Sequence, residues 1–280
     1  MRDLVEHLRG AGLIAGPVIE EIVGLRLRLR LGFERARRLM TVEANAAIRG
    51  AFVGGASEVL VNDSHGSFRN LLPDELDPRA RMVQGKPRLL GMMAGVEQGC
   101  QGVFMIGYHA RSQSRGILAH TINSFAFARV WLGGQELGEA GIYSALAAEF
   151  GVPALLASGD DVFAAETRPL LPQARFVITK TAQGHSSGIS LSPHNACGAI
   201  EAEAREVMRA CAAAPPAAPS PMALPVQCRV QTQSSALADL FAILPGVERT
   251  DAVTISFTSA TVQDAVRTLN SLSAMSAFLR

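Results

Sequence analysis

The sequence predicts an α/β fold with a mostly parallel sheet, helices on both faces of that sheet, and a smaller C-terminal βαβα lobe. First, short apolar runs that contain β-branched residues alternate with helical patterns, as at 58–65, 103–109 and 152–157. Second, an Ala/Pro-rich stretch at 213–225 separates these elements from a further set of strands and helices. Third, 280 residues can bury one large core, with or without a small second one.

The predicted organisation has three parts. A main α/β domain covers residues 1–212, of which 1–33 are atypical, a linker covers 213–225, and a small α/β lobe covers 226–280. The linker marks the boundary because its Ala/Pro composition packs poorly as helix or sheet. Within the lobe we expect strands at 226–230 and 252–257 and helices at 235–244 and 261–278.

Residues 1–33 fit this pattern poorly. From 25 to 31 leucine and arginine alternate strictly, which is the period of a strand with one charged face. The alternation leaves three interpretations open: a solvated edge strand, a poorly ordered arm, or a basic strip that binds an acidic partner. A clear amphipathic helix follows at 34–52, with apolar residues at three- and four-residue spacing, and Gly54 and Gly55 end it.

The middle of the chain continues the alternation of strands and helices. After the first buried strand we expect a proline-containing loop at 67–88 and a helical piece near 89–99. Gly133 and Gly134 suit the positive φ angles of a hairpin turn. The remaining expected elements are strands at 117–121, 152–157 and 175–179, the hairpin at 127–137, and helices at 139–150, 160–171 and 192–212.

Composition excludes several classes of partner. The formal net charge of +1 gives no electrostatic drive toward nucleic acid or an anionic membrane. No apolar run is long enough to span a bilayer, and charges near the N-terminus do not fit a secretory signal. The four cysteines are widely spaced, with no Cys-x-x-Cys pair, which favours reduced thiols over disulfides or a thiolate zinc site. We therefore expect a cytoplasmic protein without nucleic-acid or membrane partners.

Two histidines follow the ends of predicted buried strands. His65 ends the segment Val-Asn-Asp-Ser-His at 61–65, and His109 ends Ile-Gly-Tyr-His at 106–109. Ligands of open α/β sheets bind beyond the carboxyl ends of the strands, so these two imidazoles are candidates for a shared site. A single histidine at a strand end is more often structural, but two at equivalent positions favour a site.

His120 and Glu139 follow downstream and complete the set of candidates. Imidazole and carboxylate ligands suit zinc, and three histidines with one carboxylate at one sheet edge suffice for a metal-assisted hydrolase. His120 suits proton transfer. Glu139 either ligates a metal or only places a favourable charge at a helix N-terminus, and Asp63 either orients an imidazole or caps its loop. Neither a Gly-x-Gly-x-x-Gly nor a Gly-x-Ser-x-Gly motif is present.

Several motifs occur in the order found in the zinc-dependent D-aminopeptidases. They are Glu-Arg-Ala-Arg-Arg-Leu-Met-Thr-Val-Glu-Ala-Asn at 34–45, Val-Asn-Asp-Ser-His at 61–65, Ile-Gly-Tyr-His-Ala at 106–110, Leu-Ala-His-Thr at 118–121 and Gly-Glu-Ala-Gly at 138–141. From residue 34 onward the chain resembles this family, more weakly beyond the linker. The resemblance implies hydrolysis of short peptides or amides with an N-terminal D-amino acid, an α/β main domain, a two-zinc centre and a homo-oligomer, a decamer in the prototype.

By this resemblance His65, His109 and Glu139 are zinc ligands and His120 is the catalytic histidine. The chain departs from the family at its N-terminus. Family members begin with a strand ending in Asp-x-Glu-Gly, whose carboxylates complete the metal centre, but residues 1–33 contain no Asp-x-Glu, and the equivalent position falls near 12–16. We therefore expect one zinc ion or none.

The missing carboxylates leave two hypotheses about function. The first is a metal-dependent aminopeptidase that acts on short D-amino-acid peptides through a zinc-bound water. The second is a catalytically impaired family member that serves as an oligomeric peptide-binding or structural protein. A shifted reading frame or a misplaced start would explain residues 1–33 under the first hypothesis, and loss of activity would explain them under the second.

Overall fold

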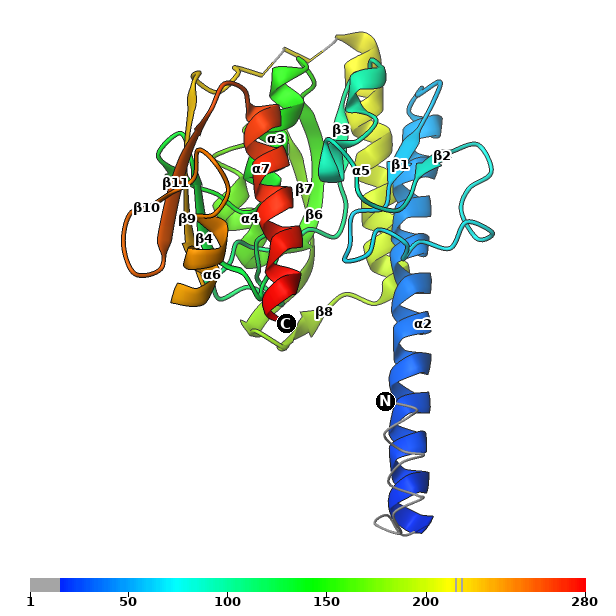
Figure 1. Ribbon diagram of the computed structural model, residues 1–280. Helices are drawn as coiled ribbons and strands as arrows, with labels where there is room; N and C mark the ends of the chain where they lie inside the picture. Colours follow the sequence, from blue (N-terminus) through cyan, green and yellow to red (C-terminus); the bar gives the residue numbers. More distant parts are fainter. Residues whose placement is uncertain (1–15, 215, 218) are drawn as a thin grey trace.

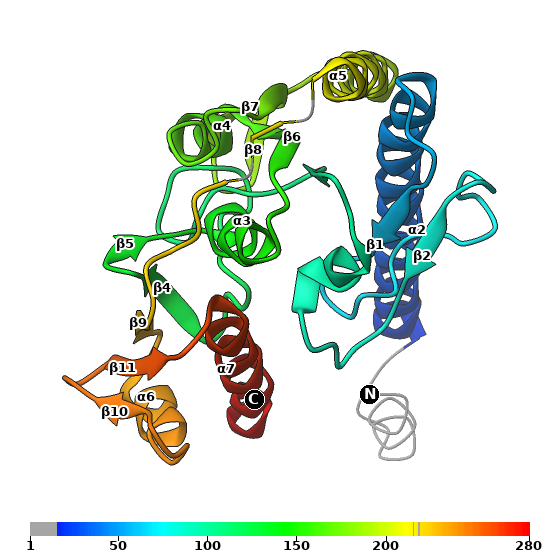
Figure 2. The same ribbon diagram turned by 90° about the horizontal axis from the view of Figure 1, so that it is seen from above.

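The structure is a computed structural model that describes residues 16–214, 216–217 and 219–280. Its strands form three sheets of two, five and four strands (Figures 1 and 2). The prediction of a mostly parallel sheet with a smaller C-terminal βαβα lobe is therefore corrected to a mixed α/β fold with parallel and antiparallel sheets. The cause is long-range pairing between strands on either side of the linker, which local periodicity does not encode.

The four-stranded sheet has the order β3-β6-β7-β8. β3 (Val103–Met105), β6 (Ala154–Asp160) and β7 (Arg175–Gly184) run parallel, and β8 (Ser187–Ser190) is antiparallel to β7. Every residue of β6 is buried, as expected for a parallel strand with both faces covered. This strand was predicted at the correct place from its apolar run.

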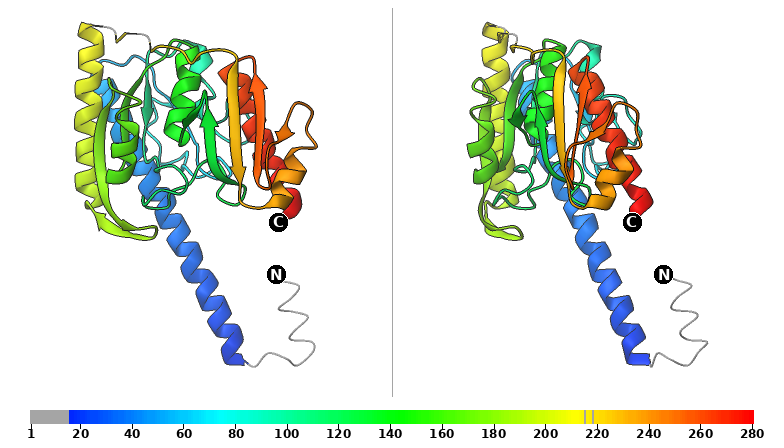
Figure 3. Two further views of the ribbon diagram at one scale, coloured as in Figure 1. Left: turned by 90° about the vertical axis from the view of Figure 1, so that its left-hand side faces the viewer. Right: turned by 60° about the vertical axis from the view of Figure 1, so that its left-hand side comes forward.

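Helices cover both faces of this sheet (Figure 3). On one face, α2 (Gly16–Val53) and α5 (Pro193–Ala213) pack against β6 and β7 in a core that includes Ala47, Leu156 and Ile200. On the other face, α3 (Glu139–Glu149) and α4 (Asp161–Thr167) contribute to the larger core. Asp160 caps α4 by accepting a hydrogen bond from the Phe163 amide at 2.7 Å, and Ser192 caps α5.

The five-stranded sheet is antiparallel throughout and has the order β10-β11-β9-β4-β5. The predicted hairpin is confirmed, with Gly133 and Gly134 at φ angles of +57° and +81° between β4 and β5.

The C-terminal elements join this sheet and its core: β9 pairs with β4, and α7 packs against α3. The bounds are β4 Phe127–Leu132, β5 Gln135–Glu136, β9 Val226–Thr232, β10 Glu248–Arg249, β11 Thr254–Ser259, α6 Ser235–Phe241, α7 Val262–Met275 and a 3-10 turn at Ser276–Leu279. The predicted domain division at 213–225 stays a prediction.

A small two-stranded sheet pairs β1 (Leu60–Asn62) in parallel with β2 (Arg81–Val83). β1 is the first predicted histidine strand, whereas β2 lies in the stretch predicted as loop. The helical piece expected near 89–99 consists of two 3-10 turns, Gly91–Met93 and Val96–Gln98. Glycines with positive φ interrupt this stretch, and these conformations do not fit a continuous α-helix.

Residues 25–31 are helical, so the interpretation as a strand or disordered arm is wrong for this part of the chain. They belong to α2, which begins at Gly16, continues through the predicted helix at 34–52 and projects beyond the sheets at its N-terminal end (Figure 1). Leucine and arginine are both strong helix formers, and here this propensity and the adjoining helix outweigh the two-residue period. The prediction of an atypical N-terminal segment also covered residues 1–15, which lie outside the described residues.

In the part of the chain that the structure describes, no helix combines the length and the apolar character needed to cross a bilayer. α2 has the length, but its arginines make it too polar.

Close packing of α2 on α5 depends on glycine. A Cβ atom added at Gly50 would lie 2.3 Å from the backbone oxygen of Glu201, whereas one added at Gly198, within α5, would meet nothing within 4 Å. We expect Gly50→Ala to lower the free energy of unfolding by about 1–3 kcal/mol through overpacking. Gly198→Ala should raise the free energy of unfolding by up to about 1 kcal/mol, because alanine favours the helix. Urea denaturation of both variants checks this; equal effects would contradict it.

Candidate active site

The four candidate residues line one large cavity. His65 follows β1, His109 follows β3, His120 lies in a loop and Glu139 lies in the first turn of α3. All four contribute to the lining of a cavity of about 1760 Å³. The order of strands and loops therefore brings together side chains that are up to 74 positions apart in the sequence.

Within this group His109, His120 and Glu139 lie closest together. His120 Nε2 is 3.6 Å from Glu139 Oε1, and the ring centroids of His109 and His120 are 5.0 Å apart. His65 is more exposed than the other three. Among residues 16–214, 216–217 and 219–280, no three His, Cys, Asp or Glu side chains are close enough to form a metal site as they stand.

His109 is held by a backbone carbonyl. Its Nδ1 lies 3.1 Å from the oxygen of Ile117, so an Nδ1–H donor would leave Nε2 free to bind a metal or accept a proton. Burial, with a smaller effect from the nearby His120, lowers the pKa of His109 to about 4. The ring is therefore neutral at physiological pH, which is the form that binds metals.

His120 lies in a turn, and the strand predicted at 117–121 is wrong. Leu118 has a φ of +53°, which a β-strand does not contain, and its amide donates to the His185 oxygen at 2.8 Å. The Leu118 oxygen in turn lies 2.7 Å from His120 Nδ1. This contact directs the other ring nitrogen toward Glu139.

Glu139 is a buried carboxylate. Its Oε1 accepts a hydrogen bond from the Ile122 amide at 2.8 Å and also faces His120. Burial raises the pKa of Glu139, and the nearby His120 opposes this shift. A buried carboxylate requires a compensating positive group, which a protonated imidazole or a cation provides.

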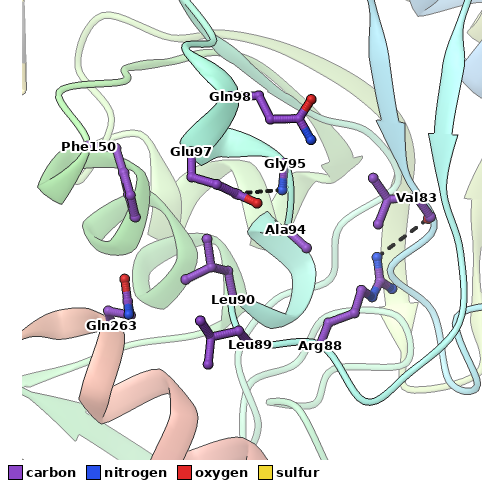
Figure 4. Close-up of a pocket in the computed structure, with 10 residues that line it drawn as sticks. All are labelled: Val83, Arg88, Leu89, Leu90, Ala94, Gly95, Glu97, Gln98, Phe150 and Gln263. Atoms are coloured by element: carbon purple, nitrogen blue, oxygen red, sulfur yellow. Dashed lines mark hydrogen bonds between the residues drawn. The ribbon is translucent and has the colours of Figure 1, made fainter.

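A second, smaller cavity of about 310 Å³ lies beside the loop that contains the two 3-10 turns (Figure 4). Most of its lining is apolar, and the Glu97 carboxylate accepts a hydrogen bond from the Gly95 amide at 2.7 Å. None of the four candidate residues lines it. Arg88, Leu89, Ala94, Gly95 and Gln98 line both cavities, so the smaller cavity adjoins the larger one without reaching the candidate residues.

Comparison with known proteins identifies the family. The model of peptidase family M55, described as D-aminopeptidase, matches residues 28–271. The chain belongs to this D-aminopeptidase family. The matched region contains all four candidate residues.

A sequence match and a structural match support the assignment. The chain is 35% identical over 164 residues to the D-aminopeptidase of Bacillus subtilis (strain 168), a stretch that covers 59% of this chain and 60% of that protein. A solved structure of a Zn-dependent D-aminopeptidase from Bacillus subtilis, described as a self-compartmentalizing protease, superposes with a TM-score of 0.83. That match has 26% sequence identity and covers 88% of each chain.

The donor types fit the zinc dependence of this relative. Two imidazoles and one carboxylate are a common ligand set for catalytic zinc. The neutral His109 ring is in the form that binds a metal. Burial raises the pKa of Glu139, and a bound cation would favour its ionised form. His65 would have to move toward these two side chains. The donor types present therefore fit zinc, although the described side chains do not form a compact ligand cluster as they stand.

Asp63 caps its loop, which decides between the two interpretations of this residue. Its carboxylate accepts hydrogen bonds from the amides of Asn70 and Leu71 at 2.5 and 2.7 Å. These bonds fix the loop that carries His65, and the Asn70 side chain also donates to the His65 oxygen. Asp63 therefore positions the backbone of this loop.

Sequence reasoning missed Glu43 and Lys180, which also line the cavity. Glu43 lies on α2, where burial raises the pKa of its carboxyl and Lys180 opposes this shift. A helix places residues four apart on one face, and Glu43 is four positions before the buried Ala47. That spacing was the available signal. Lys180 lies in the middle of β7, and the sequence offered no comparable signal for it.

Proposed function

We propose that this protein is a zinc-dependent aminopeptidase that hydrolyses short peptides with an N-terminal D-amino acid. The observation that carries the proposal is the grouping of His120, Glu139 and His109 on a single cavity in a member of the D-aminopeptidase family. We assign His65, His109 and Glu139 as the residues that hold the metal, and His120 as the catalytic residue.

A bound zinc ion would supply a polarised water and Lewis-acid assistance to the scissile carbonyl. His120 moves the proton: its Nδ1 is held by the Leu118 oxygen, so Nε2 can accept a proton and return it to the leaving amine. Glu139 stabilises the positive charge that His120 carries between these two transfers, because the two side chains are 3.6 Å apart.

Two further polar groups would bind the substrate. Arg88 Nε and Asn270 Nδ2 are buried nitrogens without a hydrogen-bond partner in the described part of the chain, and both residues line the cavity. A buried donor without a partner costs free energy, which an incoming acceptor recovers. We infer that carbonyl or carboxylate oxygens of a short peptide provide those acceptors.

We propose one zinc ion per chain, and a homo-oligomer that resembles the self-compartmentalizing relative, with ten subunits by family resemblance. The single ion follows from the lack of an Asp-x-Glu sequence in residues 1–33. Metal analysis of the purified protein should give about one zinc or less per chain. Light scattering should give a mass that is a multiple of the chain mass of 29.6 kDa.

Release of D-alanine from D-alanyl-D-alanine tests the activity directly. We expect turnover that depends on added zinc and is abolished by a chelator, because the metal provides the attacking water. L-alanyl-L-alanine is the matched control and should react more slowly. Absence of both bound zinc and turnover would reject the proposal for this chain.

The lack of a compact three-ligand cluster among the described residues favours a second candidate function. In this alternative, the protein is a catalytically impaired family member that binds peptides or forms a structural oligomer. Equilibrium dialysis with D-alanyl-D-alanine separates the two: peptide binding without zinc and without turnover supports the alternative. Turnover would exclude it.

A further inference from the structure

One carboxylate of the large cavity has no role in the proposed mechanism. Glu43 lies on α2 and lines the same cavity as the four candidate residues. Its side chain is half-buried; burial raises the pKa of its carboxyl, and Lys180 of β7 opposes this shift. In the described part of the chain, no hydrogen-bond donor contacts this carboxylate. A partly buried acceptor without a donor is stabilised by a donor that enters the cavity beside it.

Hydrogen bonds on either side of Glu43 fix its position. Thr41 and Asn45 each accept a hydrogen bond from a backbone amide of the segment 63–80, at 3.1 and 2.8 Å. This segment joins β1 to β2 and contains His65. The part of α2 that carries Glu43 is therefore fastened to the segment that carries one of the residues assigned to the metal.

The Glu43 carboxylate also lies beside the end of β3. A Cβ atom added at Gly107 would be 3.9 Å from Glu43 Oε2, and Gly107 is two positions before His109. Lys180 acts electrostatically on both Glu43 and His109, so the three side chains are close to one another. Figures 1 and 2 show α2 beside β1, which leads to His65. Glu43 is therefore next to the candidate active site.

The other carboxylates that line the cavity in the described residues already have donors. Asp63 and Glu139 accept hydrogen bonds from backbone amides. Glu58 forms an ion pair with Arg81 at 2.6 Å. Among these carboxylates, Glu43 is therefore the one that can accept hydrogen bonds from a bound molecule without giving up a contact within the protein.

An aminopeptidase substrate brings such a donor to this place. The α-amino nitrogen is bonded to the same carbon atom as the carbonyl group of the first residue, so it lies close to the atoms that react. At neutral pH much of this nitrogen is an ammonium group, which has a positive charge and several N–H donors. A carboxylate accepts these N–H groups in charge-assisted hydrogen bonds, which are stronger than neutral ones.

We propose that Glu43 binds the α-ammonium group of the substrate and thereby restricts the site to peptides with a free N-terminus. The contact orients the first residue so that its carbonyl group faces His120 and the residues assigned to the metal. The inference rests on the proposed function, because it names the substrate group that the same site recognises.

Isothermal titration calorimetry with D-alanine tests the proposal, because D-alanine carries the ammonium group but has no peptide bond to hydrolyse. We expect a dissociation constant of about 1 mM or below. N-acetyl-D-alanine is the matched probe: it keeps the methyl side chain and the carboxylate but lacks the positive charge. It should bind at least about tenfold more weakly. Failure of D-alanine to bind, or equal binding of the two probes, would overturn the proposal.

Variants of the protein assign the effect to Glu43. Glu43→Gln should weaken the binding of D-alanine by about 10–100-fold and leave that of N-acetyl-D-alanine unchanged. Glu43→Asp keeps the charge and should restore part of the affinity. Glu34→Gln is the control, since Glu34 is an exposed carboxylate on the same helix and does not line the cavity. An equal loss for both probes would reject the proposal, because Glu43 would then only maintain the shape of the cavity.

Steady-state kinetics with D-alanyl-D-alanine distinguish failure of this inference from failure of the proposed function. Glu43→Gln should raise KM by about tenfold or more. Turnover with an unchanged KM and kcat would remove Glu43 from substrate binding and leave the proposed function intact. Conversely, binding of D-alanine that depends on Glu43, without any turnover, would support the ammonium site and reject the peptidase activity.

Discussion

Replacement of His120 by alanine should lower kcat for D-peptide hydrolysis by about 10²–10⁴-fold, the range typical of loss of a general acid–base group. His120 Nε2 is directed at the buried Glu139, and no other imidazole in the described residues makes such a contact. The neighbouring His109 does not replace it as a proton carrier, because a pKa of about 4 makes the His109 ring a weak base.

Steady-state kinetics on D-alanyl-D-alanine measure this effect, and the bound zinc should be unchanged. His194→Ala is the control, since His194 is exposed on α5 and does not line the cavity. If His120→Ala retained most of the parent kcat, or if it lost zinc to the same extent as activity, the role in proton transfer would be wrong.

The Glu139→Gln variant should lower the affinity for zinc by at least about 10–100-fold, because the neutral amide is a poor metal ligand. The metal-free variant should be no less stable than the metal-free parent. The glutamine oxygen can still accept the hydrogen bond from the Ile122 amide, and the cost of burying a charged carboxylate is removed.

Competition with a zinc-binding dye gives the affinity, and thermal unfolding in the presence of a chelator gives the stability. The matched control is Glu97→Gln, which changes a carboxylate in the smaller cavity and should leave the zinc affinity unchanged. Equal zinc affinities of Glu139→Gln and the parent would remove Glu139 from the set of metal ligands.

The positions of His65, His109 and Glu139 at the ends of their elements could be predicted because the surroundings of these three residues are local. His65 and His109 each follow a short apolar strand, and Glu139 begins a helix whose start is marked by the preceding glycines. The loop of His120 was predicted incorrectly as a strand. Its conformation depends on the positive φ of Leu118 and on a hydrogen bond to His185, a residue far away in the sequence.

By itself, the sequence determined the elements with a strong local period: the buried β6, the β4-β5 hairpin, the helix at 34–52 and the strands that precede the histidines. It also determined the donor types of the site. The tertiary structure alone decided that β9 pairs with β4, that residues 25–31 extend α2, and that the four candidate residues line one cavity. Side-chain periodicity records which face of an element is buried, whereas the partner of each edge is decided by backbone pairing between distant segments.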